Sequence, residues 1–177
     1  MTPWVRKSAL TVHLVCSVGW IGAALAYLAL GIFAATSDDT ATIRAAWIAM
    51  ELTGWAVIVP LAVGTLLTGL VVSVASPWGL LRHYWVVISL ALTVFSVAVT
   101  VLHMPAVTSM ANVAQQAAPA DLNRLGTDLF HPGVGLVVLL VTMVLNVYKP
   151  KGMTRYGQRK QREQRAQQTK QRTALVP

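Results

Sequence analysis

Charged residues and cysteines are both scarce in this chain of 177 residues. Only 11% of the residues are charged, whereas a soluble domain has about 25%, which excludes an ordinary soluble globular domain. The single cysteine, Cys16, excludes an intramolecular disulfide framework and any metal site built from several cysteines. No phosphate-binding loop, zinc-protease histidine pair or spaced nucleophile and base occurs in the sequence. The informative features are therefore the apolar runs and the histidines.

Hydrophobic residues make up 55% of the chain and gather in four uncharged runs of at least 20 residues each. A helix needs about 20 apolar residues to cross the hydrocarbon core, and only helices or closed barrels satisfy their backbone groups there. We therefore predict an all-α fold, a four-transmembrane-helix antiparallel bundle. The spans are expected at about 9–35, 48–75, 84–104 and 130–148. A tight turn at 77–79 is expected to join the second and third spans.

Basic residues are concentrated at one side of this topology. Residues 149–177 contain nine basic residues and one acidic residue, whereas residues 1–148 contain five of each. Arg6 and Lys7 precede the first span, and Arg82 precedes the third. The positive-inside rule therefore predicts that both termini are cytoplasmic. We divide the chain into a transmembrane domain, 1–148, and a basic cytoplasmic tail, 149–177.

The tail is expected to be loosely ordered and to lie against the lipid bilayer. Polybasic segments beside a span bind anionic lipid head groups with about 1 kcal/mol per basic residue near the surface. Nucleic acid is disfavoured as a partner because the tail has one aromatic residue for base stacking, Tyr156.

Proline and glycine predict irregular positions within the spans and loops. Pro60 is expected to kink the second span. Gly64 and Gly69 would let a neighbouring helix or a flat cofactor come close. The long connection 105–131 is expected to hold a short surface helix broken at Pro119.

Four histidines, His13, His83, His103 and His131, lie in or at the end of predicted spans. Ionisable residues within spans are costly and indicate function by default. Because about 30 Å of helix separates His83 from His103, these two cannot bind the same metal ion. The topology instead predicts an inner pair, His13 and His83, and an outer pair, His103 and His131.

Two imidazoles from facing helices are typical ligands of a low-spin haem iron, and bundle cores hold such cofactors. His13, Trp20 and Tyr27 recur every seven residues on one face of the first span. Arg82 would neutralise haem propionates at the inner site, and Arg44 and Arg124 are the cations near the outer one. The sequence thus predicts one or two b-type haems. The predicted cofactor-binding residues are His13, His83, His103, His131, Trp20 and Arg82.

Two alternatives use the same residues. Copper would be bound at the outer side by His103 with the thioethers of Met104 and Met110, and Cys16 would add a soft donor near His13. Histidines at helix ends are also common as solvated interfacial residues, which would make the protein a membrane scaffold without a cofactor.

The first span carries His13-Leu14 and Trp20-Ile21-Gly22, an H-L-x5-W-I-G pattern. This pattern resembles the opening helix of small bacterial integral membrane proteins that include the copper-resistance D type and the membrane protoporphyrinogen-oxidase type. The stretch PWGLLRHYWVV at 77–87 resembles the inner turn of their uncharacterised relatives. The resemblance implies that His13 is an axial haem ligand and that the chain is a multi-pass protein of a bacterial-type plasma membrane. Oxidase activity is not carried over, because the further polar residues of that type are missing.

The expected function is that of a membrane b-type cytochrome that transfers electrons across the membrane or handles haem. If both histidine pairs held haem, the two cofactors would line up along the third span. The sequence leaves open which redox partner or quinone is used, and whether the chain forms a homo-oligomer.

Overall fold

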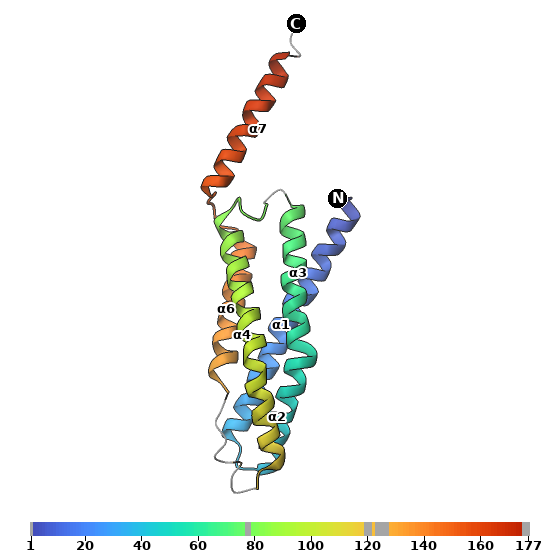
Figure 1. The fold of residues 1–177 in the computed structure, drawn as a ribbon, viewed down its shortest axis with the longest axis vertical. Helices are drawn as coiled ribbons and strands as arrows, with labels where there is room; N and C mark the ends of the chain where they lie inside the picture. The colour runs from blue at the N-terminus through green and yellow to red at the C-terminus, as the bar shows by residue number, and fades with distance from the viewer. Residues whose placement is uncertain (1, 77–78, 119–121, 123–127, 175–177) are drawn as a thin grey trace.

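Helices make up most of the chain in the computed structural model, which describes residues 2–76, 79–118, 122 and 128–174 (Figure 1). The first three spans and the tail each form long helical stretches, and a π-helical turn, η1, interrupts the second span. The helices are α1 (Pro3–Thr36), α2 (Thr40–Thr53), η1 (Gly54–Ile58), α3 (Val59–Ala75), α4 (Tyr84–Gln116), α6 (Phe130–Tyr148) and α7 (Arg155–Ala174).

Four helical segments are long and apolar enough to cross a membrane: α1, the continuous α2–η1–α3, α4 and α6. The prediction of an all-α bundle of four transmembrane helices is therefore confirmed, and the chain has the build of a multi-pass membrane protein. The second span begins earlier than predicted, at Thr40, and α4 continues through Pro105 to Gln116. Part of the expected 105–131 connection is thus a direct extension of α4. The break expected at Pro119 and residues 77–78 of the expected turn lie outside the described residues.

The four spans form a square in cross-section. The first span, α1, packs against α2, α3 and α6, and α4 packs against these same helices. The spans α1 and α4 therefore lie diagonally opposite each other. The start of α1 and the start of α7 lie at one end of the bundle (Figure 1), which we call the proximal end. The other end, where α1 ends and α6 begins, is the distal end.

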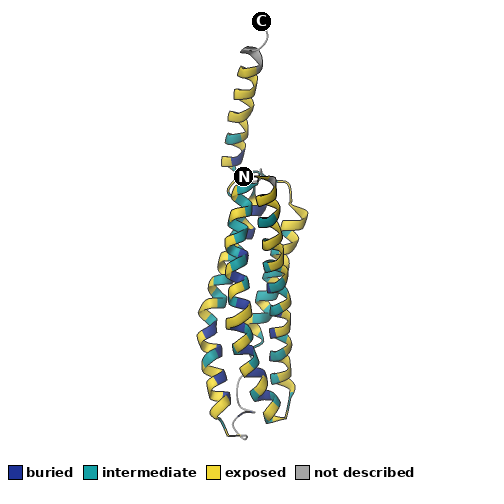
Figure 2. Cartoon of the chain, turned by 90° about the vertical axis from the view of Figure 1, so that its right-hand side faces the viewer, coloured by how far each residue is buried: buried dark blue, intermediate teal, exposed yellow. Residues whose placement is uncertain are grey.

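The tightly packed core lies in the distal half of the bundle. Its members come from the second half of α1, from α2, η1 and α3, from the second half of α4, and from Leu122. No residue of α6 is fully buried, and Figure 2 shows exposed residues along most of the bundle surface. The wall formed by α6 is therefore the loosest of the four, and the main cavity lies beside it.

The π-helical turn η1 lies immediately before Pro60, where the sequence predicts a kink. Proline has no N–H to donate, and its ring collides with the carbonyl four residues earlier in a regular α-helix. A π-helical turn is a common way for a helix to accommodate such a break. The disturbance therefore takes the form of a wider turn over Gly54–Ile58.

Asp39 caps the start of the second span at the distal end. Its carboxylate accepts hydrogen bonds from the Thr42 hydroxyl (2.6 Å) and from the backbone N–H groups of Thr42 and Ala41 (3.1 and 3.3 Å). These bonds, the Thr42 hydroxyl first, lower the pKa of Asp39. The cap is therefore present above the ordinary aspartate pKa and is lost as the pH falls through the lowered pKa.

The basic tail, for which loose order is expected, contains the helix α7. Its start is tied to the α3–α4 turn: the Thr154 N–H donates to the Arg82 carbonyl (3.0 Å), and the Thr154 hydroxyl donates to that of Leu81 (2.6 Å). Gly157 lies directly on the Arg82 carbonyl, where a Cβ atom would collide. Figure 1 shows α7 leaving the proximal end of the bundle and extending away from it.

Candidate functional site

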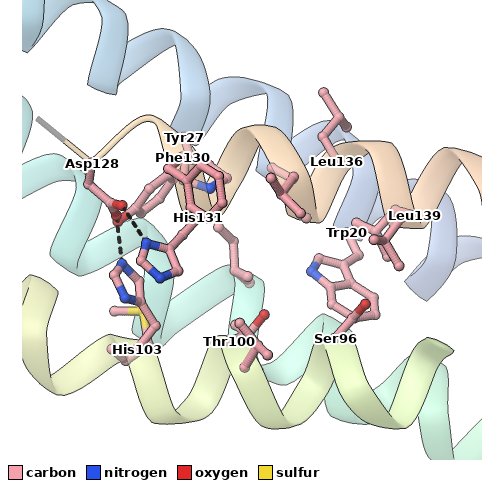
Figure 3. A pocket seen from close by; sticks show the side chains of 18 of the residues that line it. Trp20, Tyr27, Ser96, Thr100, His103, Asp128, Phe130, His131, Leu136 and Leu139 are labelled. Atoms are coloured by element: carbon pink, nitrogen blue, oxygen red, sulfur yellow. Dashed lines mark hydrogen bonds and ion pairs between the residues drawn. The ribbon is translucent and has the colours of Figure 1, made fainter. Parts of the chain in front are cut away.

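A cluster of His103, Asp128 and His131 lies in the distal half of the bundle, where α6 begins (Figure 3). His103 Nε2 lies 2.7 Å from Asp128 Oδ2, and His131 Nδ1 lies 3.3 Å from Asp128 Oδ1. The two imidazole rings are stacked, with centroids 3.9 Å apart and an interplanar angle of 22°. The structure thus brings the predicted outer histidine pair into direct contact and adds a carboxylate to it.

The helix α1 holds the carboxylate of this cluster in place. The Tyr27 hydroxyl donates to Asp128 Oδ2 at 3.1 Å. One turn later, Gly31 lies against the loop, so that a Cβ atom there would lie 3.2 Å from the Asp128 carbonyl oxygen and 3.1 Å from the Leu129 side chain. Asp128 is therefore fixed by a hydrogen bond and by a close helix–loop approach.

The donor atoms of the cluster are close enough together to bind one metal ion. One ligand atom from each of His103, Asp128 and His131 lies within 4.8 Å of the other two. Two imidazoles and a carboxylate are ligands of zinc and of non-haem iron, and three protein ligands leave a coordination position open. The Tyr27 hydroxyl would then be the outer partner that orients the carboxylate.

A cavity of about 310 Å³ extends from the cluster toward the middle of the bundle. It lies between α1, α4 and α6, with Trp20, Ser96 and Leu139 among its walls (Figure 3). Its lining is almost entirely apolar apart from the cluster and Tyr27 at one end and a few hydroxyl groups on α4. A second cavity, of about 300 Å³, lies on another side of the cluster and includes Trp47 and Met110.

The predicted inner pair has a different environment. His13 Nδ1 lies 3.1 Å from the Thr68 hydroxyl, and its ring lies on Gly69, where a Cβ atom would be 3.1 Å from His13 Cε1. His83 precedes α4, forms a backbone bridge with Met153, and its ring centroid lies 6.5 Å from that of Trp85. His13 thus packs on α3, whereas His83 belongs to the junction between α4 and the tail.

The neighbours of Gly64 and Gly69 are side chains of α1. Gly69 receives the His13 ring, and Gly64 receives Cys16, whose Sγ would be 3.1 Å from a Cβ atom there. The close approach predicted at these glycines is thus made by α1, whose side chains occupy the space beside them.

The other predicted site residues are distributed over both ends. Trp20, which periodicity groups with His13, lines the cavity beside the outer pair instead. The Arg82 side chain packs on Gly79, and its carbonyl holds the tail. Arg44 donates to the Ala117 carbonyl at 2.9 Å and so caps the end of α4, while Arg124 lies outside the described residues.

The two predicted thioether ligands of copper, Met104 and Met110, line different cavities. Met104 is buried and packs against Gly54 of η1. Met110 lines the second cavity together with the cluster. Met104 lines the cavity of about 310 Å³ and Met110 lines the second one, and His103 lines both, so each thioether shares one cavity with His103.

A haem held between His103 and His131 does not fit this arrangement. In bis-histidine ligation the porphyrin lies between the two imidazoles, which face each other across the iron. Here the rings are stacked on each other at 3.9 Å, and both point a nitrogen at Asp128. The donor set therefore fits a single metal ion better than a bis-histidine haem.

Asp128 and Tyr27 are the two residues of this site that the sequence analysis did not assign to it. Asp128 precedes His131 by three residues, a D-x-x-H spacing that places both side chains near each other at a helix start. That spacing is a usable signal for the carboxylate. Tyr27 has no comparable local signal, because it reaches Asp128 only through the packing of α1 against the loop before α6.

No family model matches this chain, and neither a curated protein nor a solved structure shows significant similarity to it. The function therefore has to be argued from the geometry of the cluster and its cavities.

Proposed function

We propose that this protein is a membrane metal-binding protein that holds one divalent first-row transition metal ion with His103, Asp128 and His131. The observation that supports this most directly is the convergence of the three ligand atoms within 4.8 Å of one another. The ligands come from α4, from the loop before α6 and from α6, so that the ion would also tie these elements together.

The surroundings of the cluster support the same proposal. Ionisable groups inside a membrane bundle are costly unless they are paired or bind an ion. The Asp128 side chain is only 10% exposed and accepts bonds from Tyr27 and from the histidines, as a carboxylate ligand with an ordered outer shell would. Three protein ligands would leave a coordination position open for another ligand, and the three residues line both cavities.

The test is metal binding by the full-length protein in detergent, with cobalt(II) as a spectroscopic probe of a nitrogen and oxygen site. We expect one cobalt ion per chain and a visible absorption band that zinc displaces. Removing one of three ligands generally weakens a site severely, so His103→Ala and His131→Ala should each abolish the band, and Asp128→Asn should weaken it strongly.

The matched control is His13→Ala, which removes an imidazole from the same bundle outside the cluster. This variant should bind cobalt as the wild type does. Unchanged cobalt binding in a His103→Ala/His131→Ala double variant would contradict the proposal.

Haem remains a second candidate because the apolar cavity of about 310 Å³ has His103 and His131 at one end. One of these histidines, rather than both, would then bind the iron. The inner haem at His13 is likewise still a prediction. A b-type absorption spectrum of the purified protein would favour haem, and its loss in His13→Ala or in His131→Ala would assign the site.

We further propose that the termini lie in the cytoplasm and that α7 contacts anionic lipid head groups. The excess of basic residues at the proximal end supports this orientation, and Arg155, Arg159 and Lys160 lie in the first turns of α7, closest to the bundle. The metal cluster would then lie toward the side of the membrane that faces away from the cytoplasm.

A further inference from the structure

The main cavity reaches the surface of the bundle within the membrane-spanning region. Phe95 of α4 and Val134 of α6 line the cavity, and both side chains are also exposed on the outside of the bundle. Both residues lie in helices that are apolar enough to cross a membrane. A molecule that enters between α4 and α6 would therefore come from the lipid phase.

Polar groups occupy one end of this cavity and define the head of its occupant. His103, Asp128, His131 and the Tyr27 hydroxyl gather at the distal end, whereas the opposite end is closed by Trp20 and Leu139 (Figure 3). Among the described residues that line the cavity, none is lysine or arginine. Apart from the proposed metal ion, a phosphate head group would therefore meet a carboxylate and no basic side chain to pair with its remaining oxygens. This lining favours a neutral oxygen-bearing head over a phospholipid.

The aromatic residues in the walls of the cavity favour a flat ring. Aromatic side chains from three elements line the cavity: Trp20 and Tyr27 on α1, Phe95 on α4 and Phe130 on α6. Aromatic side chains pack against planar rings with favourable offset or edge geometry. A volume of about 310 Å³ is at the lower end for small-molecule sites, so the ring would fit inside while an attached chain extends toward the lipid.

We propose that this cavity binds a lipid-soluble quinone or quinol, with a ring oxygen directed at the metal cluster and the alkyl or isoprenoid chain leaving between α4 and α6. This inference rests on the proposed function, because the metal-bearing cluster is its polar end. The neutral oxygens of the ring suit both an open metal position and hydrogen bonds from the imidazoles.

Two glycines of α6 provide a matched pair of variants. Gly135 lines the cavity and a Cβ atom there meets nothing within 4 Å, so a larger side chain would fill the cavity without displacing the backbone. Gly133 has equally open space around it and does not line either cavity. Gly135→Leu should therefore block the site, and Gly133→Leu should leave it open.

The experiment titrates the full-length, cobalt-loaded protein in detergent with a decyl-substituted benzoquinone and follows binding by calorimetry. We expect saturable binding by the wild type and by Gly133→Leu, and affinity at least about tenfold weaker in Gly135→Leu. Decylbenzene, which has the same chain and ring without the oxygens, should also bind at least about tenfold more weakly than the quinone.

The outcomes separate this inference from the proposed function. Equal quinone affinity in Gly135→Leu and the wild type would overturn the assignment of the cavity. Equal affinity for decylbenzene would show a slot for acyl chains and would also overturn it. If haem co-purified with the wild type and not with Gly135→Leu, the cavity would be assigned to a porphyrin instead. In each case, cobalt binding by the same samples tests the proposed function independently. A wild type that binds cobalt but does not bind the quinone contradicts the quinone inference alone.

Discussion

At the scale of single residues, the site depends on a carboxylate that three other side chains contact. Asp128 is bonded by Tyr27 from α1, by His103 from α4 and by His131 from α6. Both of its oxygens are engaged, so a metal ion would displace histidine contacts from the carboxylate and keep the bond from Tyr27. The tyrosine is therefore a positioning residue rather than a ligand.

Replacing Tyr27 by phenylalanine should weaken metal binding without removing it. The variant loses the hydroxyl that orients Asp128, and outer partners of metal ligands are worth about 10- to 100-fold in affinity. Cobalt titration of the wild type and Tyr27→Phe measures the change. Tyr148→Phe is the control, because Tyr148 is 79% exposed at the end of α6. Equal affinity of all three proteins would show that the Tyr27 bond has no role in the site.

At the scale of helices, small residues decide how closely the spans approach. Gly64 and Gly69 of α3 leave room for Cys16 and His13 of α1. Gly54 begins the π-helical turn and leaves room for Met104 of α4, whose Sδ would lie 2.6 Å from a Cβ atom at that position. The turn before Pro60 is therefore in close contact with α4 one residue after His103.

Gly54→Ala should lower the stability of the bundle. The added methyl group collides with the buried Met104 side chain, and overpacking of this kind costs about 1–3 kcal/mol. Thermal unfolding in detergent should show a lower midpoint for Gly54→Ala than for the wild type. Gly22→Ala is the matched control on α1, because a Cβ atom there meets nothing within 4 Å. A midpoint for Gly54→Ala equal to that of Gly22→Ala would mean that Met104 moves aside freely.

At the scale of the whole molecule, the two halves of the bundle differ in packing and charge. The distal half carries the core, the proposed metal cluster and both cavities. The proximal end carries the start of α1 and the basic helix α7, which is joined to the α3–α4 turn through Thr154 and Gly157. No described residue of α7 lines either cavity, so the two ends can be tested independently.

Deletion of residues 155–177 should leave cobalt binding unchanged and reduce the number of anionic lipids that stay bound. The deletion removes seven of the nine basic residues of the tail, each worth about 1 kcal/mol near an anionic surface. Native mass spectrometry of the protein with phosphatidylglycerol measures the bound lipid, and neutral phosphatidylcholine is the control. Loss of cobalt binding in the truncated protein would show that the two ends are coupled.

The sequence by itself determined the number of apolar spans and the approximate level of each histidine along the bundle. Hydropathy is a property of local composition, so uncharged runs long enough to cross a bilayer indicate helices whatever their neighbours are. Antiparallel connection then places His103, late in the third predicted span, at the level of His131 at the start of the fourth, although α4 itself continues to Gln116. The basic charge of the tail likewise follows directly from its composition.

Only the tertiary structure decided what each histidine contacts. The rotation of a helix about its axis and the choice of neighbouring helices depend on packing between residues far apart in the chain, which spacing along one helix does not specify. Because α1 and α4 lie diagonally opposite each other, His13 packs on Thr68 and Gly69 of α3, and Trp20 and Tyr27 belong to the distal cavity. The loose fit of α6 beside this cavity, and the approach of Asp128 to two imidazoles, likewise exist only once the four spans have packed together.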